Sequence, residues 1–301
     1  MSKLRSLAIL GALAVAGSSM AAHAQPPGPA DAQAGILDNP CPPPLQPPAQ
    51  MEALQKVGPR AVFESRDPEV TAFLREEDRR RSLDRAGLCR YRSANVELAA
   101  KAPAPTAVFI GDSITDFWPG LDGAFFTDNG FTGRGIGAQV TSQGLLRFQQ
   151  DVVDLHPKVV HILYGTNDIA GLAGPTTYER IQNNLIAMVQ LARANHIAVI
   201  IGTILPISHL PGGPDDPTLT PKIVAMNAWI REYGKREKVV VADYYPALSD
   251  GAGRFRAELN SDGVHPTLAG YRVMEPITRA AVQAALAQKA AAAKTGTEKP
   301  A

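Results

Sequence analysis

Four short apolar runs, each followed by a glycine or an aspartate, constrain the fold of this chain more than any other feature. They cover residues 106–110, 159–164, 197–201 and 239–242. Unbroken runs of this length, rich in β-branched side chains, are typical of strands that are buried on both faces. The segments between them have helical periodicity, with apolar residues on one stripe over residues 181–192. Strands that alternate with amphipathic helices predict a parallel sheet covered on both sides.

A fifth, weaker strand is expected just before Arg134, so the pattern predicts one α/β domain, a three-layer α/β/α sandwich. Residues 25–59 hold ten of the 25 prolines. Proline fixes φ and lacks an amide donor, so this segment is predicted to be an extended arm or linker. Residues 60–104 are densely charged and predict a helical extension at the N-terminal side of the sandwich. Residues 291–301, rich in Ala, Lys and Thr, are predicted to be a disordered tail.

The charge balance argues against nucleic acid as the main partner, although it leaves room for a local basic patch. The 301 residues contain 30 Lys and Arg against 29 Asp and Glu, for a formal charge of +1. Phosphate binding normally requires a strongly basic surface. The chain is 45% apolar and 20% charged, an ordinary globular balance that excludes disorder along the whole length.

The N-terminus has the pattern of a secretion signal. Lys3 and Arg5 precede an apolar run over residues 7–15, and residues 22–24 read Ala-His-Ala, a signal-peptidase motif. The apolar run is shorter than the roughly 20 residues that a membrane span requires. Residues 1–24 are therefore predicted to be a cleaved signal peptide, and the mature chain to be periplasmic or secreted without a transmembrane span. The alternative is an uncleaved N-terminal anchor.

The chain has two cysteines, Cys41 and Cys89. An even pair in an oxidising compartment suggests a disulfide, which here would connect the proline-rich arm to a predicted helix. The alternative is a pair of unpaired buried thiols.

Polar motifs follow the predicted strands, where parallel sheets bind their ligands. Ser113 follows the first strand, Gly135 the weak second strand and Asn167 the third. Asp262 and His265 lie together just before the last predicted helix. Because the strand ends meet at one edge of a sheet, these positions are candidates for a single site.

The residue types suit acyl transfer. A serine hydroxyl is a weak nucleophile and needs a base, and an imidazole with an ordinary pKa near 6.5 suits that task. His265 is the candidate base, and Asp262 can hold its tautomer. The developing oxyanion needs hydrogen-bond donors, which the amides of Ser113 and Gly135 and the carboxamide of Asn167 could supply.

Four blocks of this sequence resemble those of the SGNH hydrolases, also called GDSL-type esterases. They are Gly111–Ser113, Gly135, Gly165–Asp168 and Asp262–Pro266. The resemblance is greatest to bacterial esterases similar to lysophospholipase and platelet-activating-factor acetylhydrolase. It implies a flavodoxin-like five-stranded sheet in the order 2-1-3-4-5, within a hydrolase domain at residues 105–290. It also implies Ser113 as nucleophile, His265 and Asp262 as the rest of a triad, and Gly135 and Asn167 in the oxyanion hole.

The sequence departs from the family pattern in the second block. Gly133 and Ala138 stand where the family often has asparagine and a final glycine. Thr115 stands where the G-x-S-x-G elbow of the α/β-hydrolase fold would have its second glycine, so that fold is disfavoured.

The resemblance implies a serine esterase that acts on an ester of a small molecule, carbohydrate or lipid, and the predicted signal peptide implies that it is exported. Short acyl groups are favoured, because no long apolar lid segment is evident between the blocks. The alternatives are a lysophospholipase or thioesterase with the same triad, and a non-catalytic protein that binds sugar or lipid. No metal or other cofactor is expected, because the histidines are scattered without metal-ligand spacing. The sequence does not define an oligomeric state.

Two further residues are candidate substrate contacts. Trp118 follows the nucleophile and either lines the substrate pocket or packs in the core. Arg134 either contacts an anionic group of the substrate or forms a surface salt bridge. Asp112 and Asp168 are expected to cap turns, and residues 209–217 are a candidate specificity loop.

Overall fold

The computed structural model describes residues 41–43, 45–57, 61–62 and 64–295. The chain divides into two compact units, Met1–Pro42 and Pro43–Ala301, and the elements below belong to the second. The predicted signal peptide at residues 1–24 lies outside the described residues, as do the first part of the proline-rich arm and residues 296–301.

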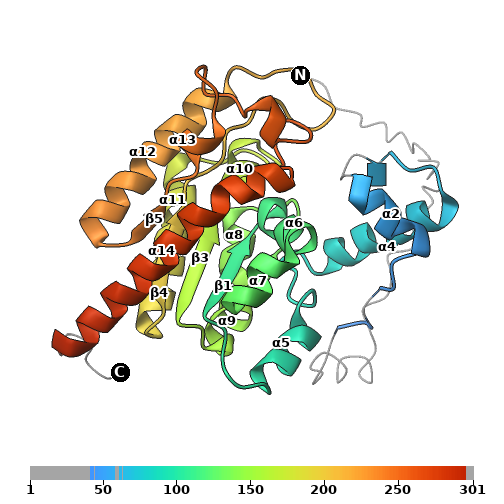
Figure 1. The fold of residues 1–301 in the computed structure, drawn as a ribbon. Helices are drawn as coiled ribbons and strands as arrows, with labels where there is room; N and C mark the ends of the chain where they lie inside the picture. The colour runs from blue at the N-terminus through green and yellow to red at the C-terminus, as the bar shows by residue number, and fades with distance from the viewer. Residues whose placement is uncertain (1–40, 44, 58–60, 63, 296–301) are drawn as a thin grey trace, which may run out of the picture. The chain divides into compact units, whose positions relative to one another are not determined.

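The core of the fold is a parallel sheet of five strands in the order β2-β1-β3-β4-β5 (Figure 1). The strands are β1 (Ala107–Gly111), β2 (Phe131–Gly135), β3 (Val159–Leu163), β4 (Ala198–Gly202) and β5 (Val240–Ala242). This confirms the predicted sheet and its order. Gly111, the last residue of β1, pairs with Gly135 of β2 and with Leu163 of β3. Strands β2, β1 and β3 therefore end level, and the motifs after them begin at one edge of the sheet.

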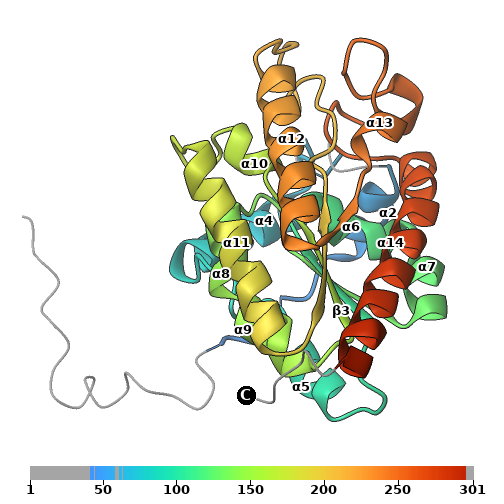
Figure 2. The same cartoon turned by 90° about the vertical axis from the view of Figure 1, so that its left-hand side faces the viewer.

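Helices cover both faces of the sheet, as predicted. Those between and after the strands are α6 (Ser113–Leu121), α7 (Gly123–Asn129), α8 (Thr141–Leu146), α9 (Phe148–Asp151), α10 (Thr166–Ile169), α11 (Tyr178–Ala194), α12 (Leu219–Glu237), α13 (Tyr245–Leu248) and α14 (Leu268–Thr295). Two 3₁₀ helices are η2 (Val153–Leu155) and η3 (Ala257–Leu259). Figure 2 shows α11 and α12 on one side of the sheet, with α7 and α14 on the other.

Alternate side chains of each strand enter the two cores. Val108 and Ile110 of β1 pack with the apolar stripe of α11, whereas Phe109 packs on the opposite face with aromatic residues of α6 and α7. Ile181 and Leu185 are buried in α11 as its periodicity predicts. Burying each such side chain contributes about 1.5–3 kcal/mol, so these two cores fix the sheet that carries the site.

The N-terminal side of the unit contains α2 (Ala49–Val57), α4 (Pro68–Leu83) and α5 (Arg92–Ala99). Helix α2 lies inside the segment predicted to be an extended arm, and its Met51 is buried against Val62 and Val70. The prediction of an arm without a core was wrong here, because the proline-free stretch after residue 48 places Met51 and Leu54 on one helical face.

Three smaller expectations can be compared with the structure. Cys41 and Cys89 are disulfide-bonded, as predicted, but Cys89 lies in the turn between α4 and α5 and not in a helix. Residues 291–295, expected to be disordered, continue α14, since their alanines favour helix most strongly. No helix among the described residues is both long and apolar enough to cross a membrane.

Candidate active site

Ser113 occupies the first turn of α6, directly after β1. Asp112 caps this helix, because its side chain accepts a hydrogen bond of 3.0 Å from the Ile114 amide. The expected turn-capping role of Asp112 is therefore confirmed. The N–H of Ser113 itself is among the first of the helix, which have no intrahelical acceptor. The serine thus combines a hydroxyl and an amide donor at the edge of the sheet.

The structure brings Ser113, His265 and Asp262 into one hydrogen-bonded chain. His265 Nε2 lies 2.8 Å from Ser113 Oγ, and His265 Nδ1 lies 2.8 Å from Asp262 Oδ2. A carboxylate only accepts hydrogen bonds, so Nδ1–H donates to it. In the neutral ring Nε2 then accepts from the serine hydroxyl. This is the arrangement in which imidazole can remove the serine proton.

A tight loop before α14 holds Asp262 and His265 in place. Asp262 Oδ1 accepts hydrogen bonds from the amides of Val264 (3.2 Å) and His265 (2.9 Å). The Ser261 amide donates to the His265 carbonyl at 2.9 Å. Burial acts to raise the pKa of Asp262, but these bonds and the one from the imidazole together lower it below its ordinary value. Asp262 is therefore an ionised partner for His265 at neutral pH.

Asn167 lies in α10, the short helix that follows β3, and its carboxamide is hydrogen-bonded. Nδ2 donates to the Gln139 carbonyl at 2.9 Å, which leaves its second N–H for another acceptor. The neighbouring Asp168 accepts from the Thr141 amide at 3.0 Å and from the Thr141 hydroxyl at 2.6 Å. Asp168 thereby caps α8, and it joins the loop after β3 to the loop after β2.

The structure corrects the role expected of Gly135. The Ile136 amide donates to Gly111 of β1 at 3.0 Å, and successive amides of a strand point to opposite sides. The Gly135 amide therefore faces away from β1 and Ser113, on the side where its carbonyl accepts from the Tyr91 hydroxyl. The glycine serves packing instead: a Cβ there would lie 2.1 Å from the Asp116 amide nitrogen of α6.

Ala138 is a further candidate donor, one that the sequence did not single out. Its φ of 64° is left-handed, an unusual conformation for a residue with a side chain. Its neighbours adjoin the other site residues, since Gln139 O accepts from Asn167 and a Cβ on Gly137 would lie 3.8 Å from Ser113 Cβ. Among the described residues, no hydrogen bond uses the Ala138 amide. The family's glycine preference at this position was the available sequence signal.

The structure does not place Trp118 or Arg134 at a substrate. Trp118 is fully buried and stacks on Phe125 with ring centroids 5.1 Å apart. It therefore belongs to the core, the alternative reading. Arg134 is also buried, and its Nε donates to Asn95 at 2.7 Å. Its guanidinium lies over the Tyr91 ring, so it forms neither a substrate contact nor a surface salt bridge.

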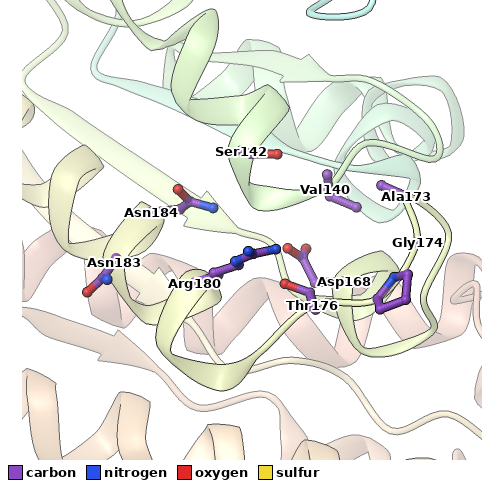
Figure 3. Close-up of a pocket in the computed structure, with 10 residues that line it drawn as sticks. Val140, Ser142, Asp168, Ala173, Gly174, Thr176, Arg180, Asn183 and Asn184 are labelled. Atoms are coloured by element: carbon purple, nitrogen blue, oxygen red, sulfur yellow. The ribbon is translucent and has the colours of Figure 1, made fainter.

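Two cavities adjoin the site, one lined by Asp262 and His265 and the other by Asp168. The larger, about 660 Å³, includes His265 and Asp262, and the candidate specificity loop contributes part of its wall. That part consists of His209, Pro211, Gly212 and Asp215. The smaller, about 350 Å³, lies beside Asp168 and is lined by Arg180, Asn183 and Asn184 (Figure 3). In Figure 3 the Arg180 guanidinium and the Asp168 carboxylate point toward one another.

The sequence model of the GDSL-like lipase/acylhydrolase family matches residues 109–273. This match contains Ser113, Asn167, Asp262 and His265, and it spans more than half of the 301 residues. The chain belongs to this family. The SGNH resemblance is thereby confirmed, and the protein stands among the carboxylic ester hydrolases.

Individual relatives agree with this assignment. Esterase TesA of Pseudomonas aeruginosa is 29% identical over 198 residues, which are 61% of this chain and 91% of TesA. The uncharacterized lipoprotein YqeF of Bacillus subtilis is 40% identical over 76 residues, 24% of this chain and only 31% of YqeF. A solved structure of a candidate acylhydrolase from Bacteroides fragilis is 39% identical with a TM-score of 0.62, and the match covers 67% of this chain and 98% of that one.

Proposed function

We propose that this protein is an exported serine esterase that hydrolyses short-chain acyl esters through an acyl-enzyme intermediate. The observation that carries the proposal is the hydrogen-bonded chain Ser113–His265–Asp262, with both links at 2.8 Å. A serine hydroxyl within hydrogen-bond reach of an imidazole that a carboxylate orients is the arrangement of an activated nucleophile.

In the proposed reaction, His265 Nε2 takes the proton of Ser113 Oγ as the oxygen attacks the ester carbonyl. The tetrahedral intermediate places its negative oxygen near the amides of Ser113 and Ala138 and the carboxamide of Asn167. His265 then protonates the leaving alcohol as the ester C–O bond breaks. A water molecule repeats these steps on the acyl-enzyme, which releases the acid and restores the serine. Asp262 stabilises the imidazolium at each stage.

The alcohol part of the substrate belongs in the cavity of about 660 Å³, because His265 lines it and must reach the leaving oxygen. Carboxylates of Glu64, Asp215, Asp250 and Asp262 line this cavity, and Arg254 is the one guanidinium among the described residues of its wall. Arg254 is paired with Asp250 at 3.1 Å. This charge balance favours neutral, hydroxyl-rich alcohols over phosphate-bearing ones. A carbohydrate ester therefore fits better than a lysophospholipid or a coenzyme A thioester.

The acyl part is expected to be short. The smaller cavity of about 350 Å³ has a mixed lining, with Arg180, Asn183, Asn184 and Ser142 beside Val140, Ala173 and Pro175. Its small volume and its polar groups leave little apolar area for a long chain. Export is supported by the predicted signal peptide at residues 1–24, by the disulfide-bonded Cys41 and Cys89, and by a relative that is a lipoprotein.

Hydrolysis of p-nitrophenyl acetate by the wild type and by Ser113→Ala tests the proposal. Truncation of the nucleophile should reduce turnover by at least three orders of magnitude, while the melting temperature stays close to that of the wild type. If the wild type hydrolyses the ester no faster than buffer alone but binds sugar or lipid, the non-catalytic alternative is supported instead. A Ser113→Ala variant with near wild-type turnover would contradict the assignment of the nucleophile.

A further inference from the structure

The segment between α4 and α5 packs against the loop that carries the proposed oxyanion donor. We call residues 84–91 the strap and residues 135–139 the oxyanion loop. The Ala86 carbonyl accepts from Gln139 Nε2 at 2.9 Å. Gly87 has a left-handed φ of 72°, which favours glycine, and a Cβ there would lie 2.8 Å from Cδ1 of the Ile136 side chain.

Tyr91 of the strap contacts both the oxyanion loop and α6. Its hydroxyl donates to the Gly135 carbonyl and lies 3.5 Å from Asp116 Oδ1. Its ring is covered by the guanidinium of Arg134, 4.8 Å from the ring centroid, and that of Arg90, at 5.2 Å. Burial raises the pKa of Tyr91 above its ordinary value, so the hydroxyl remains a donor throughout the physiological range.

Asp116 connects this contact to the nucleophile. It lies on α6, one turn after Ser113, and its Oδ2 accepts from the Gly137 amide at 3.1 Å. The other oxygen lies 3.7 Å from Arg90 and close to the Tyr91 hydroxyl. The helix of the nucleophile and the oxyanion loop are therefore joined by one carboxylate, and Tyr91 bridges the carboxylate and the loop from outside the sheet.

We propose that Tyr91 is a positioning residue for acyl transfer, and that the strap completes the active site by fixing the oxyanion loop relative to Ser113. This inference rests on the proposed function, because it concerns the amide of Ala138 in the intermediate. Donors stabilise an oxyanion only within about 2.7–3.1 Å of its position. A displacement of about 1 Å can cost about 100-fold in rate.

Tyr91→Phe tests the inference, because it removes the hydroxyl and keeps the ring beneath Arg134. We expect kcat for p-nitrophenyl acetate to fall about 10- to 100-fold, with KM within about twofold of the wild type, since a displaced donor acts in the transition state. Phosphonylation of Ser113 by a fluorophosphonate should slow in parallel, because its intermediate also places a charged oxygen in the hole.

Tyr244→Phe is the matched control. Its buried hydroxyl bonds to His161 at 2.8 Å and to Thr278 at 2.7 Å, on the core face of β5 and α14. Loss of these bonds should lower the melting temperature without changing kcat. A general loss of stability would affect both variants alike, whereas lost positioning affects kcat of Tyr91→Phe alone.

The inference is overturned if Tyr91→Phe keeps kcat within twofold of the wild type, or if its loss of kcat is no larger than that of Tyr244→Phe. Should Tyr91→Phe fail to fold, Asp116→Asn takes its place under the same criterion, since it weakens the same bridge. An inactive wild type would overturn the proposed function and this inference together. An active wild type with an unaffected Tyr91→Phe overturns the inference alone.

Discussion

The two sides of Ser113 are built in different ways. On the oxyanion side, the residues that hold the donors are buried, among them Gln139, Arg147 and Asp168. On the base side, Asp262 and His265 stand on a loop held by its own short-range hydrogen bonds and facing an open cavity. Charge stabilisation needs dipoles that do not reorganise, whereas substrate choice is usually assigned to loops. The contrast suggests that the first side fixes the oxyanion donors, whereas the loop that carries the base also selects the alcohol.

Arg147 shows how firmly the oxyanion side is held. Its fully buried guanidinium donates to the Gly111 carbonyl at the end of β1 and to Gln139 Oε1 in the oxyanion loop, at 3.0 and 2.7 Å. Asp151 neutralises it at 2.8 Å, with both side chains inaccessible to solvent. A buried charge is tolerated only when it is paired and hydrogen-bonded in this way. One side chain therefore ties the strand that precedes Ser113 to the loop that carries Ala138.

The largest expected effect is on the base side. His265→Ala should reduce kcat for p-nitrophenyl acetate by about 10⁴-fold or more, because Ser113 then has no base. The melting temperature should change little, since the residue lies on a loop beside a cavity. Residual turnover within tenfold of the wild type would show that another group removes the serine proton.

The next effect concerns the oxyanion side. Asn167→Ala should reduce kcat by about 10²- to 10³-fold, the size typical of one oxyanion donor. Asn195→Ala is the control, because its exposed side chain bonds only to the end of α11, and steady-state kinetics should match those of the wild type. Equal kinetics for the two variants would remove Asn167 from the oxyanion hole.

The capping residue of α6 predicts a pH effect on stability. Burial raises the pKa of Asp112 from 3.8 to about 7, so the folded chain keeps a proton that the unfolded chain loses between about pH 4 and pH 7. The free energy of unfolding should fall with rising pH in this window, by at most about 1.4 kcal/mol per unit from this group. Asp112→Asn removes the buried carboxyl whose ionisation destabilises the folded chain, and its amide oxygen can still accept from the Ile114 amide.

Urea unfolding of both proteins at several pH values measures the effect. Asp112→Asn should be the more stable protein at pH 8, with the advantage shrinking as the pH approaches 4. A stability difference that is independent of pH would show that Asp112 does not titrate in this range.

The smallest effect is expected in the cavity beside His265. Asp215→Asn removes one exposed negative charge from its wall and should raise kcat/KM for acetyl-coenzyme A about two- to fivefold, less at high salt. The value for neutral p-nitrophenyl acetate should not change. A parallel change for both substrates would show that the cavity does not select its alcohol by charge.

The sequence was sufficient to predict what depends on local pattern. Apolar runs gave the strands, and polar motifs at their ends placed Ser113 and His265 at one edge of the sheet. The sequence could not decide whether the amide of Gly135 or that of Ala138 faces the oxyanion. The direction of these amides depends on strand pairing and on a left-handed φ. The burial of Trp118 could not be predicted either, because it depends on which face of α6 packs against the core.

Tyr91 illustrates a further limit. Its contacts with Gly135 and Asp116 join segments that are 44 and 25 residues apart in the chain, and no motif or periodicity links them. Long-range contacts of a charged helical extension follow from tertiary packing, which propensity and pattern do not encode.

The most direct test of the central claim is to locate the reactive serine by mass spectrometry of peptides after treatment with a fluorophosphonate. We predict one stoichiometric adduct, on the peptide that contains Ser113, and none in His265→Ala over the same time. An adduct on a different serine, or no adduct on an active wild type, would contradict it.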